Sequence, residues 1–150
     1  MRRAERLHRS VAVIMLDIDH FKRFNDTFSH EAGDTLLREL GGFLKQQIRA
    51  GDFACRYGGE EFVLILPEIS LDDLRQSAER LREKIKGLHI QYVGERLETI
   101  TLSLGIALFP EHGATGKAIL HAADEALYEA KHQGRDRVVV ALSTAEGPDP

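Results

Sequence analysis

The stretch Arg-Tyr-Gly-Gly-Glu-Glu-Phe at residues 56–62 is the most informative part of this chain, and it lies between two apolar, strand-like runs. A Gly-Gly pair between such runs predicts a β-hairpin, because glycine enters turn conformations with positive φ at little cost. The missing side chains also let another molecule approach the backbone closely. Two carboxylates, Glu60 and Glu61, follow the turn directly. This pattern suits a phosphate-bound metal ion, although a solvated turn with two surface glutamates explains these residues alone equally well.

A second pair of carboxylates follows the apolar run Val-Ala-Val-Ile-Met-Leu at residues 11–16, which predicts a strand buried on both faces. The run leads into Asp17-Ile18-Asp19, and alternate residues of a strand share a face. Two such carboxylates repel each other unless a cation or donor groups compensate them. Magnesium usually combines one or two carboxylates with substrate phosphates. If this strand end lies beside the glycine hairpin, Asp17 and Glu60 can share metal ions.

Three further motifs accompany residues 56–62 in a fixed order along the chain. They are Asp-Ile-Asp-His-Phe-Lys-Arg-Phe-Asn-Asp-Thr-Phe-Ser-His-Glu-Ala-Gly-Asp at 17–34, Thr-Leu-Ser-Leu-Gly-Ile-Ala at 101–107, and Ala-Asp-Glu-Ala-Leu-Tyr-Glu-Ala-Lys-His-Gln-Gly-Arg-Asp at 123–136. Together the four motifs resemble the GGDEF domain, the diguanylate cyclase family, in its GGEEF variant. The resemblance spans about residues 11–140 and is far more specific than a lone Gly-Gly-Glu-Glu-Phe.

Length and composition indicate one compact domain. A chain of 150 residues with 43% hydrophobic residues has room for one sizeable core, so we expect a single domain over 1–150 with its core at about 11–140. The formal net charge of −4 argues against a nucleic-acid-binding surface. No apolar run approaches the roughly 20 residues of a membrane span. We therefore expect a cytoplasmic domain without membrane contact, in a parent protein that could be anchored through a preceding region. Cys55, the single cysteine, stands in an apolar run and is predicted to be buried.

Hydrophobic periodicity and cap residues predict an α+β fold. The expected strands are 11–16, 52–57, 61–66, a second hairpin of 89–93 with 97–108 buried on one face, and 136–140. The expected helices are 20–28, 31–49, one from Ser70 to Gly87, and 116–132. This order suits a mixed, mainly antiparallel sheet flanked by helices. The family resemblance implies the same layout, with a ferredoxin-like core shared with class III nucleotide cyclases and polymerase palms. The tail at 143–150 is expected to fray.

The resemblance implies a reaction and its catalytic residues. Diguanylate cyclases join two GTP molecules into cyclic di-GMP and release two pyrophosphates, each 3′-hydroxyl attacking the other nucleotide's α-phosphate. By resemblance, Asp17, the Ile18 carbonyl and Glu60 hold Mg²⁺, with two ions per GTP and Mn²⁺ as a substitute. Glu60 would also accept the proton and Glu61 would assist it, with the division between them left open. Lys22 would stabilise developing negative charge.

Phosphate binding is implied for the first helix, the glycine turn and the chain's closing helix. The backbone amides of Phe21 and Lys22 open a helix and can bind an anion, and Gly59 leaves the hairpin tip bare. Lys131 and Arg135 match the family positions that hold the β- and γ-phosphates. Without the resemblance, these two cations would be surface residues matched to the negative end of a helix.

Guanine recognition is implied for Asn25 and Asp34, with His30 near the base or ribose. An aspartate can accept hydrogen bonds from N1–H and the exocyclic amine of guanine, whereas adenine offers no such pair. Asp34 therefore favours GTP over ATP. Without the resemblance, Asn25 would be a helix-ending residue and Asp34 an exposed helix carboxylate. Ser29 replaces a glycine that is usual in the family, which predicts slight strain in the turn.

Product inhibition is suggested by Arg49-Ala50-Gly51-Asp52, an Arg-x-x-Asp pattern separated from Gly58 by five residues. In the family this is the inhibitory position, where Arg49 would clasp a phosphate of cyclic di-GMP and Asp52 a guanine edge. Arg80, on a later helix, matches a second inhibitory contact. The pattern by itself is weak, and its position lends it weight.

Catalysis in this family needs a homodimer, because each protomer holds one GTP. The family segment Asp-x-Leu-Thr-Gly-Leu is absent before Arg2-Arg3, so we expect the chain to begin inside its natural domain boundary, after an upstream sensor domain. The main alternative is a non-catalytic module that senses cyclic di-GMP or GTP. A third possibility is another nucleotide cyclase or a dimerisation domain. The complete glycine motif, with Asp17, Lys22 and Asp34, favours the cyclase.

Overall fold

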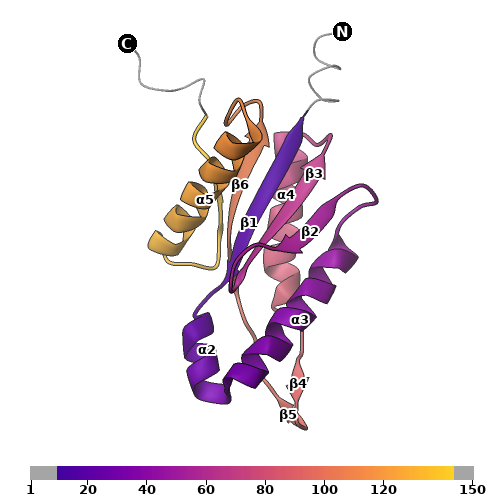
Figure 1. Ribbon diagram of the computed structural model, residues 1–150, viewed down its shortest axis with the longest axis vertical. Helices are drawn as coiled ribbons and strands as arrows, with labels where there is room; N and C mark the ends of the chain where they lie inside the picture. The colour runs from indigo at the N-terminus through magenta and orange to yellow at the C-terminus, as the bar shows by residue number, and fades with distance from the viewer. Residues whose placement is uncertain (1–9, 144–150) are drawn as a thin grey trace.

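The computed structural model describes residues 10–143, so Arg2-Arg3 and nearly all of the tail predicted to fray lie outside the described residues. Eleven elements follow one another in this part of the chain (Figure 1). They are β1 (Val11–Ile18), α2 (Phe21–Phe28), α3 (His30–Gln47), β2 (Phe53–Arg56), β3 (Glu61–Pro67), α4 (Leu71–Ile85), β4 (Gln91–Tyr92), β5 (Glu95–Arg96), β6 (Leu102–Phe109), α5 (Gly116–His132) and β7 (Val138–Val140).

The main sheet has five strands in the order β2-β3-β1-β6-β7. Neighbouring strands run antiparallel, except that β6 and β7 are parallel. The helix α5 packs on β6, β1 and β7, and Figure 1 shows it on the face of the sheet opposite to α4. The predicted α+β class, with a mixed and mainly antiparallel sheet between helices, is confirmed.

The central strand β1 is buried on both faces, as its unbroken apolar run predicts. Ile14 and Leu16 belong to the larger core, together with leucines of α3 and α4. Val13 and Met15 point the other way and pack in a second core with α5. Each fully buried side chain of this size stabilises the fold by about 1.5–3 kcal/mol relative to exposure. This rigid strand carries Asp17 at its end.

The helices α3 and α4 each begin after a serine whose side chain caps the first turn. The hydroxyl of Ser29 accepts a hydrogen bond from the N–H of Ala32 at the start of α3, and Ser70 accepts one from Asp73 at the start of α4. Such caps satisfy backbone donors that have no partner within the helix. Ser29 itself has a φ of 148°, in the region that favours glycine, which fits the strain expected of its turn.

Gly105 of β6 lets α5 approach the sheet closely. A Cβ at this position would lie 2.2 Å from the carbonyl oxygen of Ala123 and 2.3 Å from the nitrogen of Leu127. Both atoms are backbone atoms of α5, so the helix would have to move to admit a side chain. The position of α5 matters because its end carries Lys131.

Two sequence-based predictions are wrong. The second hairpin joins only the two-residue strands β4 and β5, whereas β6 lies between β1 and β7 and is buried on both faces, because helices cover both sides of the central sheet. Ser103 is fully buried there, since its hydroxyl has a carboxylate partner. Cys55 is exposed because β2 is an edge strand and α5 packs on β1, β6 and β7.

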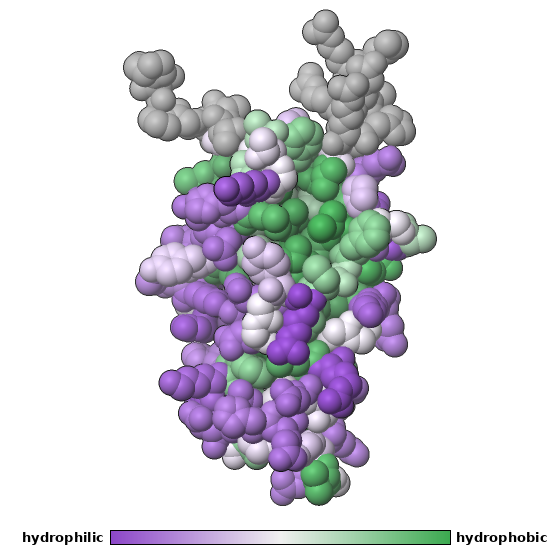
Figure 2. Space-filling model, in the orientation of Figure 1, coloured by the Kyte–Doolittle hydropathy of each residue, from purple (hydrophilic) through white to green (hydrophobic). Residues whose placement is uncertain are grey.

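The surface divides into two zones along the long axis of the molecule. Figure 2 shows apolar residues gathered over the upper, sheet-bearing part, while hydrophilic residues dominate the lower end around α2, the start of α3 and the β4–β5 hairpin. Within residues 10–143, none of the helices combines the length and the apolar character needed to cross a membrane.

Candidate active site

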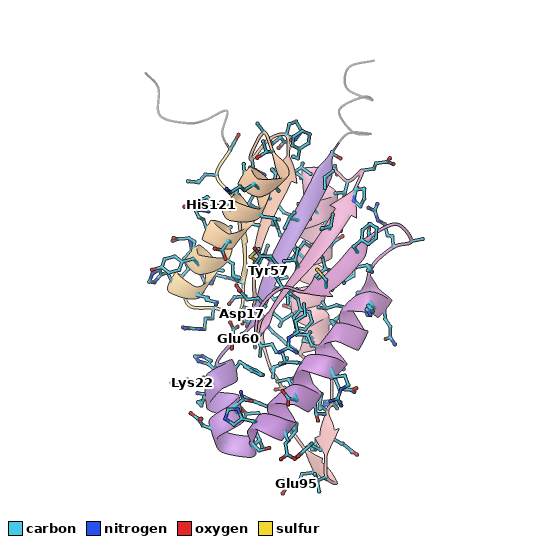
Figure 3. All side chains as sticks on the ribbon, viewed as in Figure 1. Asp17, Lys22, Tyr57, Glu60, Glu95 and His121 are labelled. Atoms are coloured by element: carbon cyan, nitrogen blue, oxygen red, sulfur yellow. The ribbon has the colours of Figure 1, made fainter. Side chains whose placement is uncertain are left out.

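The end of β1 lies beside the glycine hairpin, as the metal-site hypothesis requires. The pairing of β1 with β3 places Asp17 opposite Glu61, and β2 pairs with β3 to form the predicted hairpin. The N–H of Tyr57 donates to the Glu61 carbonyl oxygen at 2.8 Å across the turn. Figure 3 shows Asp17 and Glu60 next to each other at the end of the sheet, with Lys22 on the neighbouring helix.

Arg56 fixes the tip of the hairpin, a role that sequence reasoning missed. Its guanidinium donates to the carbonyl oxygen of Gly59 from Nε at 3.0 Å and from Nη2 at 2.5 Å. The tip is otherwise exposed, so these charge-assisted hydrogen bonds limit its conformations. The turn that positions Glu60 is therefore held from within the hairpin.

Asp17 is a buried carboxylate, and only one of its two oxygens accepts a hydrogen bond in the described residues. The side chain is almost inaccessible, and Oδ2 accepts a hydrogen bond from Nζ of Lys131. Oδ1 is buried and receives no hydrogen bond within the described residues. Burial raises the pKa of Asp17, although Lys131 opposes this shift. An unsatisfied buried carboxylate oxygen is costly, so it indicates a missing cation or donor.

The pKa values of Glu60 and Glu61 are raised, like that of Asp17. Burial raises the pKa of Glu60, and the nearby charge of Asp17 raises it further. Asp17 and Glu60 are close enough to share a hydrogen bond when one of them is protonated. Burial also raises the pKa of Glu61, with further contributions from Asp17 and Asp124. The three carboxylates thus resist carrying their full charge together without a cation.

A cavity of about 430 Å³ joins these carboxylates to positive groups. Its lining residues are Asp17, Ile18, Asp19, His20, Phe21, Lys22, Arg23, Asp26, Glu60, Lys131 and Arg135. Phe21 and Lys22 open α2, whose free N–H groups favour anions. A cavity lined by both carboxylates and cations suits a triphosphate bound with metal ions. Within residues 10–143, no three Asp, Glu, His or Cys side chains form a group that could hold a metal ion.

A larger groove of about 830 Å³ lies between α3 and β2. Asp34 lines it together with apolar residues such as Leu37 and Phe62 and with the cations Arg38 and Lys45. The predicted base-binding residue Asp34 thus lines this groove and is not among the residues that line the cavity with Asp17.

The comparisons with known proteins identify the family. A family model described as diguanylate cyclase, GGDEF domain, matches residues 1–137. The chain belongs to the GGDEF family of diguanylate cyclases. It is 47% identical to diguanylate cyclase DgcP of Pseudomonas aeruginosa, over 92% of this chain and 22% of that protein.

Solved GGDEF domains share the fold. The GGDEF domain of DgcB from Caulobacter crescentus, in complex with c-di-GMP, has a TM-score of 0.84 and 35% identity, covering 95% of this chain and 81% of that one. The active GGEEF domain of a diguanylate cyclase from Vibrio cholerae has a TM-score of 0.81 and 31% identity, covering 95% of this chain and 90% of that one. Since the chain spans only 22% of DgcP, it corresponds to one part of that longer relative.

The guanine-binding residues expected for a GGDEF domain lie on α2 and α3. Asn25 lies within α2, and its Oδ1 is buried without a hydrogen-bond donor in the described part of the chain. A Cβ on Gly33 would fall 1.7 Å from this oxygen, so the glycine is needed where the two helices meet. His30, the first residue of α3, is exposed, as is Asp34 one turn later. The orphaned Asn25 oxygen marks a second place where a polar partner is missing.

Of the expected inhibitory residues, Arg49 and Asp52 follow the end of α3 and Arg80 lies on α4. Arg49 donates to Asp52 in a bidentate pair, from Nε to Oδ2 at 3.2 Å and from Nη2 to Oδ1 at 3.1 Å. Arg80 of α4 lines the same small cavity as both residues. The structure therefore brings these three residues together, although they are separated by 28 positions from Asp52 to Arg80.

Proposed function

We propose that this GGDEF domain is a diguanylate cyclase that condenses two GTP molecules into cyclic di-GMP and two pyrophosphates. One observation carries the proposal: a buried carboxylate oxygen of Asp17 without a donor faces Glu60 in a cavity that also holds Lys22, Lys131 and Arg135. A cavity that combines carboxylates repelling one another with several cations is complementary to a nucleoside triphosphate with its metal ions.

Asp17, the carbonyl of Ile18 and Glu60 would hold Mg²⁺, or Mn²⁺ in its place. The free Oδ1 of Asp17 and the raised pKa values of Asp17 and Glu60 support this assignment, because a cation would stabilise their charged forms. Two such ions per nucleotide would lower the pKa of the attacking 3′-hydroxyl and neutralise charge on the phosphates.

The protein's own groups would then position the nucleotide and accept its proton. Glu60 is the proposed proton acceptor and Glu61 its assistant, since burial and mutual repulsion move their pKa values toward the working pH. Lys131 pairs with Asp17 in the present structure and can turn to a phosphate once that charge is compensated. With Lys22, Arg135 and the amides at the start of α2, it would stabilise the pyrophosphate that leaves.

GTP rather than ATP is the proposed substrate. Asn25 and Asp34 would read the guanine edge, with His30 beside the base or ribose, and Gly59 would let the nucleotide approach the hairpin. The buried, unpartnered Oδ1 of Asn25 supports this assignment. A site built around such hydrogen bonds rejects a base that leaves them unmade.

Turnover requires two protomers face to face, because each would hold one GTP. We propose a cytoplasmic homodimer controlled by a sensor domain elsewhere in the full-length protein. Cyclic di-GMP would inhibit at Arg49, Asp52 and Arg80, which line one cavity. In the present structure the Arg49 guanidinium is paired with Asp52, so Arg49, which is 54% exposed, would have to turn from Asp52 to clasp a phosphate of the product.

The decisive assay incubates the domain at high concentration with Mg²⁺ and GTP and separates the products by chromatography. Wild type is expected to form cyclic di-GMP and pyrophosphate, and Glu60→Gln is expected to form none. Glu95→Gln, on the distant β5, is the matched control and is expected to behave as wild type (Figure 3). A wild-type domain that binds GTP or cyclic di-GMP but makes no product would instead support the sensor alternative.

A further inference from the structure

Asp19 is a buried carboxylate that receives three hydrogen bonds from two distant segments. It is 7% exposed, and its Oδ1 accepts from Oγ of Ser103 at 2.5 Å. Its Oδ2 accepts from Oγ1 of Thr101 at 2.6 Å and from the backbone N–H of Asp136 at 3.0 Å. Its own N–H donates to the Thr101 carbonyl oxygen at 3.0 Å. So many charge-assisted hydrogen bonds in a buried place fix all the groups involved.

The N–H of Asp136 belongs to the turn that follows α5 and lies beside the end of β1 (Figure 1). Gly134, Arg135 and Asp136 have φ values of 124°, 65° and 48° in succession. Non-glycine residues keep such conformations only where the surrounding structure holds them. The N–H of Arg135 donates to the Ala130 carbonyl oxygen at 2.9 Å, and the N–H of Asp136 donates to Asp19. Arg135 is thus presented to the cavity by a turn fixed on both sides.

We propose that Asp19 is a positioning residue that holds Arg135 at the phosphate end of the nucleotide site, acting through the backbone of Asp136. This inference rests on the proposed function, since it takes Arg135 as a ligand of the β- and γ-phosphates. The oxygens of Asp19 already accept three donors, so it is not a further metal ligand. The end of β1 would then position both ends of the triphosphate. Asp17 would hold the metal ions, and Asp19, two residues later, would hold Arg135 at the β- and γ-phosphates.

The side chain of Asp136 provides a matched control. It forms ion pairs with Arg82 at 2.8 Å and with Lys86 at 3.0 Å, on the α4 side of the turn. These pairs are partly exposed and contribute little. Asp136→Asn removes the charge, keeps the N–H that Asp19 receives, and keeps a residue type that tolerates positive φ. We expect this variant to bind nucleotides as wild type does.

The test compares two probes by calorimetry with Mg²⁺ present. Guanosine 5′-(α,β-methylene)triphosphate carries β- and γ-phosphates but cannot react at the α–β bridge, and GMP lacks those phosphates. Asp19→Asn is expected to weaken binding of the triphosphate analogue about tenfold, the value of one charge-assisted hydrogen bond, and to leave GMP within about twofold. In an Arg135→Ala background, Asp19→Asn should cause no further loss, because coupled residues are not additive.

An equal loss for both probes, or a tenfold loss that persists in the Arg135→Ala background, would overturn the inference and make Asp19 a general support of the fold. If Asp19→Asn does not fold, Thr101→Val against Thr101→Ser tests the same contact. The hydroxyl-free variant should lose analogue affinity selectively, and equal affinities would overturn the inference. Binding needs no turnover, so this pattern in a domain that makes no cyclic di-GMP would refute the proposed function and leave the role of Asp19 standing.

Discussion

Asp17 and Asp19 are two buried carboxylates at the end of one strand, and they stand in opposite electrostatic situations. Asp17 has one oxygen on Lys131 and one without any donor in the described chain, and burial raises its pKa. Asp19 accepts three hydrogen bonds. Burial and position therefore do not separate the proposed metal ligand Asp17 from the structural carboxylate Asp19, whereas the number of donors that each oxygen receives does.

The largest expected difference between the two residues is catalytic. Asp17→Asn is expected to lower the rate of cyclic di-GMP formation at saturating GTP and Mg²⁺ by about 10²–10³-fold, because it removes charge where the metal ions would be held. Asp19→Asn should act mainly on KM, since it loosens a phosphate contact. Steady-state rates over a range of GTP concentrations measure both, and equal losses of kcat would erase the distinction.

For the stability of the metal-free domain, Asp19→Asn is expected to have a larger effect than Asp17→Asn. Asp19→Asn is expected to lower the free energy of unfolding by about 1–3 kcal/mol, because donors that now meet a carboxylate would be left unsatisfied. Asp17→Asn should change it by less than about 1 kcal/mol, since the lost pair with Lys131 is offset by relief from repulsion with Glu60. Urea unfolding at neutral pH compares the two variants, and a larger loss for Asp17→Asn would contradict the account.

The pH dependence of stability sharpens the comparison. The pKa values of Asp17, Glu60 and Glu61 are raised in the folded domain, so the folded state holds these protons more tightly than the unfolded chain. Their contribution to stability is present at acid pH and is lost as the pH rises through the folded pKa values. Mg²⁺ compensates the charged forms and should raise Tm by a few degrees more at about pH 8 than at about pH 5.

Thermal scans with and without Mg²⁺ at the two pH values check this expectation. The Asp17→Asn variant is the control and should show a smaller difference between them, because one of the three interacting charges is gone. A Mg²⁺ effect of the same size at both pH values would count against a carboxylate site.

Asp52 is a third kind of buried carboxylate, paired with an arginine that solvent and ligands can reach. Its side chain is 2% exposed, whereas that of Arg49 is 54% exposed. Arg49→Ala is expected to raise the cyclic di-GMP concentration needed for half-inhibition by about tenfold or more, and to lower the free energy of unfolding by about 1–3 kcal/mol because Asp52 is left buried without this partner. Inhibition curves test this, with Arg75→Ala on α4 as a surface control. Unchanged inhibition would show that Arg49 does not belong to a product-inhibition site.

Much of the fold follows from local patterns. The apolar run of β1, the glycine hairpin and the capped helices each follow from nearby residues, and all are confirmed. Local patterns failed for β6 and Cys55, because burial there depends on which strand is central and which is an edge. Local patterns in a single sequence do not reveal the order of the strands in the sheet.

The sequence predicted which residues form the candidate site, but not which groups donate hydrogen bonds to them. The motifs indicated Asp17, Glu60 and Lys131, and the structure brings all three to one cavity. The alternation of β1 suggested that Asp17 and Asp19 need the same compensation. The donors of Asp19 come from Thr101, Ser103 and Asp136, which lie 82, 84 and 117 positions away, so no local pattern could reveal the contacts. The only signal was the polar Thr101 and Ser103 at the start of an apolar strand.

The most direct measurement is anomalous diffraction from crystals soaked with Mn²⁺ and guanosine 5′-(α,β-methylene)triphosphate. The account predicts an ion within about 2.0–2.3 Å of oxygens from Asp17 and Glu60, and none on Asp19. An ion held by Asp19, or a bound nucleotide whose ions leave Asp17 untouched, would contradict it.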